Sequence, residues 1–345
     1  MYLGKTAGRV CRTSRASPNE SVSITGISGT GKTSRMFAME LEEVKQGNTV
    51  IVIDCGRTHL RQEIFAEVRQ EYITFENRID AVNDGLSLNL LSPLRSKDGK
   101  TESFVNHVNS AVKGLGSSFA LGGRQQGALR EVVIEAIRYL QDTHDISEAE
   151  ALVVAFERRQ DAVRTLIYQK LWSVLNCNVL RSCKKPISEH KINILDLSGV
   201  DMMTRVTLTE MILAQLWRIA CFSGQIYGSG KVTIVLDEYQ RLCTKKGSIF
   251  RCILTEGRKF QLNLLLGTQT LDVFPPETVS LLNQSATQLY FRPSANEITK
   301  IARRIDSERP SYWSAKLRSL RVGECIAVGA KEVCGHEISR PLVLM

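Results

Sequence analysis

The sequence predicts an α/β fold built on a mostly parallel β-sheet, with a helical insertion in the middle of the chain. Short, continuously apolar runs alternate with stretches of helical periodicity, which is typical of a parallel sheet covered on both faces. Residues 101–188 differ, because they show helical periodicity and no convincing strand. We therefore expect residues 1–100 and 189–345 to form the two parts of one core, with residues 101–188 inserted between them.

Six apolar runs are the expected strands of this core. They are Val22–Thr25, Thr49–Asp54, Ile192–Leu197, Val232–Leu236, Leu262–Leu266 and Gln288–Phe291. In the insertion, Ser147 and Glu150 have the spacing of a capping box, in which each side chain bonds the backbone of the other residue. This pair predicts the start of a long helix that runs toward Trp172.

The charge and the cysteines limit the class of protein. The 345 residues carry a net charge of +9, so a polyanion such as nucleic acid is the leading partner, although a merely basic enzyme is an equal alternative. The nine cysteines form no CxxC pair, which favours reduced thiols and a cytoplasmic location. No apolar run approaches the roughly 18 residues of a membrane span. The acid-poor first 20 residues leave a transit peptide open, but a core strand begins directly after them.

The strongest motif is Gly-Ile-Ser-Gly-Thr-Gly-Lys-Thr at residues 26–33, which follows the first expected strand and fits G-x-x-x-x-G-K-[ST] completely. Its glycines let successive backbone N–H groups surround phosphates, and the helix that opens behind the loop adds a positive end. We expect Lys32 to reach the β- and γ-phosphates of ATP and the Thr33 hydroxyl to ligate Mg²⁺. The other residues expected to bind the nucleotide are Gly26, Ser28, Gly29, Thr30, Gly31 and Ser34.

Two later strands end in polar residues. Asp237 and Glu238 follow Val232–Leu236, at the carboxyl end of a strand, where α/β proteins place their ligand chemistry. We expect Asp237 to hold the Mg²⁺ shell and Glu238 to polarise the attacking water. Gln269 follows Leu262–Leu266, where it would sense the γ-phosphate or orient water, with an amide that anchors a loop as the alternative.

Several arginines and a basic stretch surround the last of these strands. An arginine from a neighbouring molecule can stabilise the charge that develops in phosphoryl transfer, and Arg258 is our candidate, with Arg292, Arg303 and Arg304 as competitors. Residues 241–259 contain six basic residues and one acidic residue, so they could contact nucleic-acid phosphates without reading sequence. A solvated basic helix face is an equal alternative.

These residues resemble the HerA/FtsK superfamily of P-loop motor ATPases, in its HerA-like branch and the ATPases of conjugation and type IV secretion. Four stretches carry the resemblance: GISGTGKTSR (26–35), INILDLSGVDMMTR (192–205), VTIVLDEYQRL (232–242) and residues 255–294. In the last stretch an E-G-R-K turn precedes a strand ending in T-Q, and an F-R strand follows. The first 13 residues look like a strand pair, and residues 320–329 like a closing strand, of such proteins.

The resemblance implies a RecA-like core, a ring that is hexameric, ATP sites between subunits and translocation of DNA through the central channel. It implies that Lys32 and Thr33 are the phosphate-loop pair and that Asp237 is the acid on the Mg²⁺ side. It also implies that Glu238 is the catalytic glutamate, that Gln269 is the sensor and that Arg258 acts in trans. The expected function is thus that of a Mg²⁺-ATP-hydrolysing DNA translocase. The alternatives are an ATPase that powers protein export or assembly in a secretion or conjugation apparatus, and a nucleotide-gated switch with negligible turnover.

The sequence also departs from this family. The phosphate loop begins at residue 26, which leaves no room ahead of it for the sizeable N-terminal domain that many relatives carry. The insertion matches no motif, and its Leu-rich faces suit self-packing or a partner surface. We therefore expect assembly or docking to depend on the core, the insertion or another protein, such as a nuclease or a secretion or conjugation component.

Overall fold

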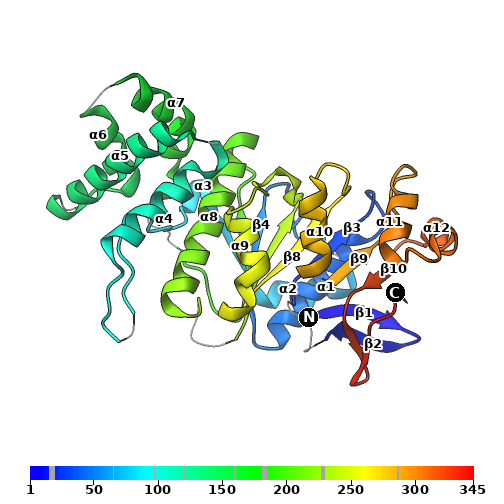
Figure 1. Ribbon diagram of the computed structural model, residues 1–345. Helices are drawn as coiled ribbons and strands as arrows, with labels where there is room; N and C mark the ends of the chain where they lie inside the picture. Colours follow the sequence, from blue (N-terminus) through cyan, green and yellow to red (C-terminus); the bar gives the residue numbers. More distant parts are fainter. Residues whose placement is uncertain are drawn as a thin grey trace.

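The computed structural model shows a central sheet with helices on both faces, a small second sheet at one end and a group of helices at the other (Figure 1). It describes the whole chain except residues 15–19, 65, 97, 120, 144, 159–160, 181–184, 227–229 and 286, and except the side chains at 67 and 285. The eight cysteines that it describes are free, and Cys183 lies outside the described residues.

The central sheet has nine strands in the order β13-β10-β9-β3-β8-β7-β4-β6-β5. The strands from β9 to β5 in this order are parallel, and β10 and β13 add an antiparallel edge. This confirms the predicted mostly parallel sheet. The strands are β3 (Val22–Thr25), β4 (Thr49–Asp54), β5 (Glu76–Asp80), β6 (Ile192–Asp196), β7 (Val232–Asp237), β8 (Leu262–Thr268), β9 (Thr287–Tyr290), β10 (Cys325–Val328) and β13 (Leu342–Leu344).

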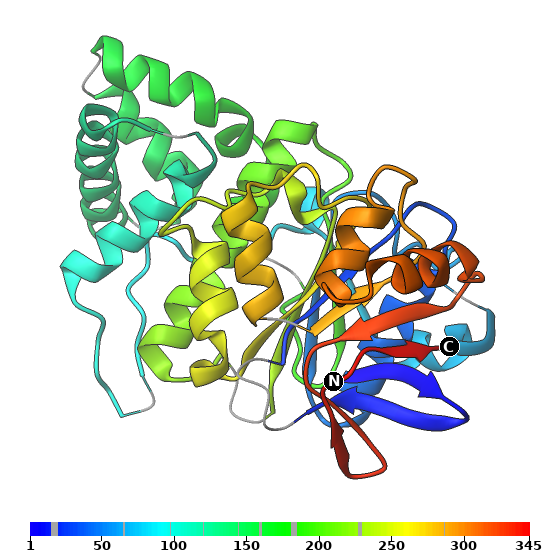
Figure 2. The ribbon, with the colours of Figure 1, turned by 45° about the vertical axis from the view of Figure 1, so that its right-hand side comes forward.

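Both faces of the sheet are buried because each strand sends alternate side chains into one of two cores. On β4, Val50 and Val52 belong to the core under α1 (Lys32–Lys45) and α2 (Ala66–Phe75). Ile51 and Ile53 belong to the opposite core. That core lies against α8 (Met202–Ser223), α9 (Ile249–Glu256), α10 (Pro276–Ser285), α11 (Ile298–Ile305) and α12 (Pro310–Ser319), and Figure 2 shows this layer from a second side.

A second, antiparallel sheet joins the two ends of the chain. Its order is β1-β2-β11-β12, from β1 (Tyr2–Thr6), β2 (Arg9–Thr13), β11 (Lys331–Val333) and β12 (His336–Ile338). The first two strands form the strand pair expected from the first 13 residues. Met345 and Lys5 exchange backbone hydrogen bonds of 2.8 and 2.9 Å, so the termini lie close together (Figure 1).

The predicted insertion is helical and lies beyond the β5 side of the sheet, far from the small sheet (Figure 1). Its helices are α4 (Phe104–Gly116), α5 (Gly123–Asp142), α6 (Glu148–Glu157) and α7 (Ala162–Asn176), and the short α3 (Ala81–Asp84) precedes them. The capping box of Ser147 and Glu150 is confirmed. The single long helix toward Trp172 is wrong, because Asp161 caps a second helix by accepting hydrogen bonds from Val163 and Arg164. The domain boundaries at residues 100 and 188 stay a prediction.

Helix α4 packs on α8 of the core, and a buried ion pair fixes the junction between core and insertion. Arg218 of α8 meets Glu102 with a shortest contact of 2.5 Å, and their side chains are only 3% and 5% exposed. Among the described residues, no helix is both long enough and apolar enough to span a bilayer.

Candidate nucleotide-binding site

The phosphate loop connects β3 to α1, as its motif predicts. Gly29 and Gly31 have φ angles of 76° and 99°, a region that favours glycine. Gly31 is also tightly approached: a Cβ atom there would lie 2.9 Å from the backbone nitrogen of Gly323. Of the other expected loop residues, Thr30 is buried and donates to the Ile27 carbonyl at 2.7 Å, and Ser28 is exposed. The loop therefore has the glycine-dependent backbone that phosphate binding requires.

Lys32 and Thr33 open helix α1 directly behind the loop, and Ser34 follows them on the exposed side. The Lys32 side chain is buried and its Nζ donates to the Ile27 carbonyl at 2.9 Å, inside the curve of the loop. Burial lowers the pKa of Lys32, while the carboxylates of Asp237 and Glu238 oppose this shift. The lysine therefore lies within electrostatic range of both predicted acids.

The carboxyl ends of three neighbouring strands bring the predicted residues to one edge of the sheet. Thr25 pairs with Thr268, and Gly267 pairs with Asp237, so β3, β8 and β7 end level with one another. Asp237 is partly buried, and burial followed by the charge of Glu238 raises its pKa. Lys32 and His59 act in the opposite direction. Carboxylate and hydroxyl oxygens are the ligands that Mg²⁺ prefers, so the donor set of Asp237 and Thr33 fits this ion.

Glu238 and Gln269 are in direct contact. Gln269 follows β8 and its Nε2 donates to Glu238 Oε1 at 2.8 Å. Glu238 has a φ angle of 60°, in the left-handed region, which directs the chain into the short 3₁₀ turn η3 (Tyr239–Arg241). In that turn Gln240 donates to the second carboxylate oxygen of Glu238. Sequence reasoning missed Gln240, because only the left-handed turn brings a residue two positions onward back to the carboxylate.

Arg258 is not near these residues in the same chain. It lies in the 3₁₀ turn η4 (Gly257–Phe260), which precedes β8, whereas Gln269 follows that strand. The seven residues of β8 span about 23 Å at roughly 3.3 Å per residue. Of its competitors, Arg292 lies beside the phosphate loop, where its carbonyl accepts from Ile27 at 3.0 Å and its side chain is exposed.

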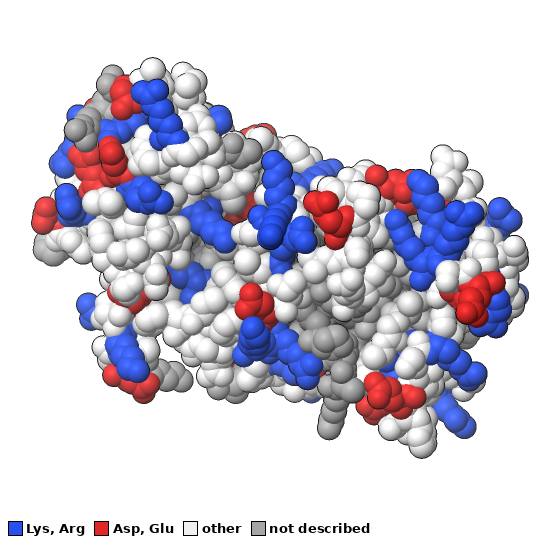
Figure 3. Space-filling view, viewed as in Figure 1, with Lys and Arg blue, Asp and Glu red and all other residues white. Residues whose placement is uncertain are grey.

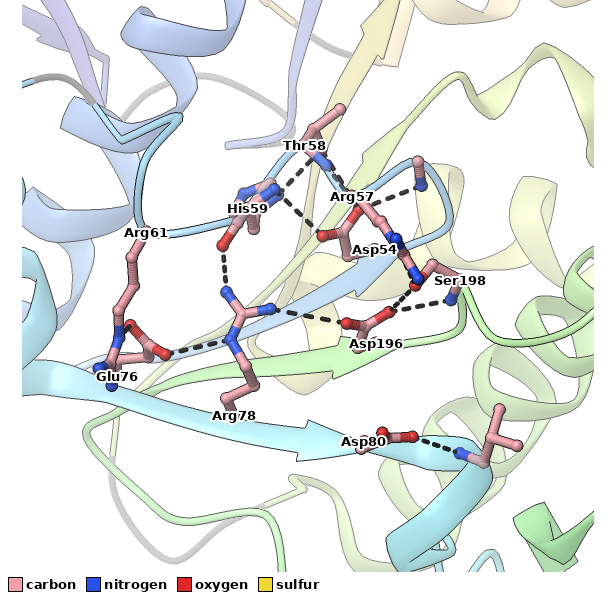
Figure 4. Close-up of polar contacts among 12 residues, drawn as sticks. Asp54, Arg57, Thr58, His59, Arg61, Glu76, Arg78, Asp80, Asp196 and Ser198 are labelled. Atoms are coloured by element: carbon pink, nitrogen blue, oxygen red, sulfur yellow. Dashed lines mark hydrogen bonds and ion pairs between the residues drawn. The ribbon is translucent and has the colours of Figure 1, made fainter.

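A second feature missed from the sequence is the rigid loop that follows β4, shown in Figure 4. The Asp54 carboxylate accepts backbone hydrogen bonds of 3.1 Å from Gly56, Thr58 and His59. The fully buried His59 ring contacts Glu40 of α1 at 3.1 Å. Although burial opposes the protonated form, Glu40 outweighs it and raises the pKa of His59. The loop thus places the His59 imidazole against α1 and within electrostatic range of Asp237.

The same loop is joined to its neighbours on the β5 side. Arg78 of β5 donates to the His59 carbonyl and pairs with Asp196 at 3.7 Å (Figure 4). Asp196 orients Ser198, whose hydroxyl accepts from the exposed Arg57 at 3.0 Å. These contacts fix the ends of β4, β5 and β6 relative to one another.

A pocket of about 220 Å³ lies beside Asp237 and Glu238. Residues of the loop after β4, the first turns of α8 and the turn after β7 line it together with these two acids. The remaining lining residues are Ile53, Cys55, Gly56, Thr58, Met202, Arg205, Val206, Thr209, Leu236, Tyr239, Arg241 and Leu242.

Comparison of the sequence with protein-family models gives no match, and comparison with curated proteins gives none either. Solved structures do match. VirB4 of Thermoanaerobacter pseudethanolicus superposes with a TM-score of 0.69 at 16% identity, over 98% of this chain and 94% of that chain. An unbound form of the bacterial conjugative coupling protein TrwB gives 0.57 at 12% identity, over 99% and 89%.

A further match is the plasmid coupling protein TrwB in complex with ADP and Mg²⁺, with a TM-score of 0.58 at 11% identity, over 94% of this chain and 84% of that chain. These identities are low, so the likeness concerns the fold. It confirms the P-loop ATPase fold that the HerA/FtsK resemblance predicts, over nearly the whole chain and including the helical segment.

Proposed function

We propose that this chain is a Mg²⁺-dependent ATP hydrolase that moves DNA through a ring of identical copies. One observation supports the proposal: Lys32, Asp237, Glu238 and Gln269 lie together at the ends of three adjacent parallel strands. The fold shared with a coupling protein solved with ADP and Mg²⁺ supports the nucleotide.

In this proposal each residue has a separate task. The loop amides and Lys32 hold the phosphates, and Thr33 with Asp237 holds Mg²⁺, which neutralises charge on the phosphate oxygens. Glu238 accepts a proton from the attacking water, and Gln269 reports the γ-phosphate through its contact with Glu238. Because the Lys32 side chain is buried, water screens its interaction with the phosphates less than it would at an exposed site.

The position of Arg258 supports a ring. It lies at the opposite end of β8 from the acids, so it has no route to the nucleotide of its own chain. We propose that it reaches the nucleotide of a neighbouring copy, and that hydrolysis requires the assembled ring, which we take to be hexameric. Copies kept apart by dilution would then bind ATP without appreciable turnover.

Charge supports DNA as the substrate that is moved. Lys245 and Lys246 are exposed on the loop that follows the turn after Glu238. A change in the position of Glu238 can therefore be transmitted to them through a few residues of backbone. Figure 3 also shows Lys and Arg side chains gathered over α11, which carries Lys300, Arg303 and Arg304. Such cations bind phosphates without reading the bases.

The test is steady-state ATP hydrolysis with and without long double-stranded DNA. We expect DNA to stimulate turnover, and the stimulation to fall as salt is added, because phosphate neutralisation releases counterions. Lys32→Ala is the blank. Glu238→Gln should keep ATP binding and lose turnover by about 10²-fold or more, the usual contribution of a general base.

Two results would count against the proposal. Normal turnover by Glu238→Gln would remove the assigned base. An ATP turnover rate that DNA does not change at any salt concentration would instead favour the ATPase of a protein export or assembly apparatus. The next step would then be a search for proteins that bind helices α4–α7.

A further inference from the structure

The carboxylate of Glu238 is held on both oxygens by amide side chains. Gln269 donates to Oε1 at 2.8 Å, and Gln240 donates to Oε2. A carboxylate can only accept, so the amide nitrogen of Gln240 must face Glu238 and its carbonyl oxygen must point the other way. That oxygen lies 3.0 Å from the Thr268 hydroxyl, whose single proton is shared with the Thr270 carbonyl at 2.9 Å. The orientation of the Gln240 amide is therefore set by Glu238.

These contacts form a closed loop of side chains between two strands. Thr268 ends β8 and Gln269 follows it, and both reach the turn that follows β7, one through Gln240 and the other directly. The turn begins at a buried anchor, because the Tyr239 ring stacks on Phe274 at 4.8 Å, whereas Gln240, one residue onward, is only half-buried. Glu238 thus has little freedom to turn toward a water molecule while both amides are bound.

We propose that Gln240 is a positioning residue that restrains Glu238 and suppresses hydrolysis until the turn moves. The inference rests on the proposed function, since it assumes that Glu238 is the base. A water that gives its proton to Glu238 must compete with amide donors for the carboxylate oxygens. Gln240 is the donor that can be withdrawn, because it lies on the turn leading to the exposed loop of Lys245 and Lys246. Gln269 instead follows directly after a fully buried strand, which fixes its backbone, and its side chain is exposed.

The test replaces Gln240 with methionine, which keeps the length of the side chain and removes the amide. We expect hydrolysis in the absence of DNA to rise about tenfold, the factor that one hydrogen bond to a charged group commonly represents. The KM for ATP should stay within about twofold, since Gln240 does not touch the phosphate loop. Stimulation by DNA should shrink by the factor that basal hydrolysis gains.

Two further variants keep the test independent of general damage. Gln284→Met, at an exposed glutamine of α10, should leave basal hydrolysis unchanged. Thr268→Val removes the hydroxyl that contacts the Gln240 amide oxygen and should raise basal hydrolysis less than Gln240→Met does. Misfolding lowers turnover, so a rise cannot come from loss of structure.

The outcomes separate the possibilities. A fall in basal hydrolysis, in a Gln240→Met chain whose thermal unfolding matches that of the wild type, would mean that Gln240 aligns the base for attack. An unchanged rate would mean that it has no part in restraint. Either result overturns the inference while leaving the proposed function intact. If the wild-type chain hydrolyses no ATP at any concentration, the proposed function fails and the inference fails with it.

Discussion

Replacing Gly267 by alanine should damage the Mg²⁺ side of the site without removing any polar group. Gly267 lies in β8 opposite Asp237, and a Cβ atom there would lie 2.5 Å from Asp237 Oδ1. Ordinary van der Waals contact begins near 3.4 Å, so the carboxylate would have to withdraw by about 0.9 Å. The new methyl group cannot move away from the carboxylate instead, because it would also lie 3.1 Å from Met36 Sδ.

A shift of this size is enough to impair catalysis. Misplacing a catalytic group by about 1 Å can cost roughly 10²-fold in rate. We expect Gly267→Ala to lower the turnover of ATP by about this factor and to raise the Mg²⁺ concentration needed for half-maximal activity. Overpacking should also cost about 1–3 kcal/mol of folding free energy, which thermal unfolding will measure in parallel.

The matched control is Gly127→Ala in α5, where a Cβ atom would meet nothing within 4 Å and φ is not positive. This variant should be as active as the wild type and more stable by about 0.5–1 kcal/mol. The reasoning is refuted if Gly267→Ala folds and hydrolyses ATP with the wild-type rate and the wild-type Mg²⁺ dependence.

Two buried charged residues away from the candidate site, Lys331 and Arg218, give predictions about stability. The Lys331 side chain is buried, and burial lowers its pKa from 10.5 to about 8. Between these two pH values the unfolded chain binds more protons than the folded chain. The free energy of unfolding should therefore rise as pH increases from about 8 to 10.5. Lys331→Met should stabilise the fold at pH 7 and abolish that rise. Urea unfolding that shows the variant less stable at pH 7 would contradict this. Arg218→Met should cost about 3–5 kcal/mol by leaving Glu102 buried and unpaired, and replacing Glu102 by Leu as well should recover part of the loss in the same assay.

The core strands and the phosphate loop could be predicted because their causes are local. Continuous apolar runs such as Thr49–Asp54 are stable in one environment, between two helical layers, and the structure reproduces that range without change. The loop of residues 26–33 is recognisable because its glycines serve a backbone conformation that other residues resist. For the same reason the edge that carries Asp237 and Gln269 followed from where the strands end.

Strand β5 could not be predicted because its sequence, Glu-Asn-Arg-Ile-Asp, has no apolar run. It forms because its polar side chains find partners far along the chain. Asn77 donates to Asn193 of β6 at 2.8 Å, and Arg78 pairs with Asp196. The break between α6 and α7 was missed for a related reason: no Gly or Pro marks it, and it depends on the capping carboxylate of Asp161.

The turn at Glu238 shows why the arrangement of the site is the least predictable part. A non-glycine residue at φ 60° costs of order 1 kcal/mol or more, so local preference argues against this turn. It persists because the buried Tyr239 anchors the next residue and Asp237 Oδ1 accepts the backbone N–H of Glu238 at 3.1 Å. The strain places the Glu238 carboxylate between two amides that the sequence shows only as separate glutamines. A residue held in this way can change position in one step when one amide leaves, which is what the proposed function requires of Glu238.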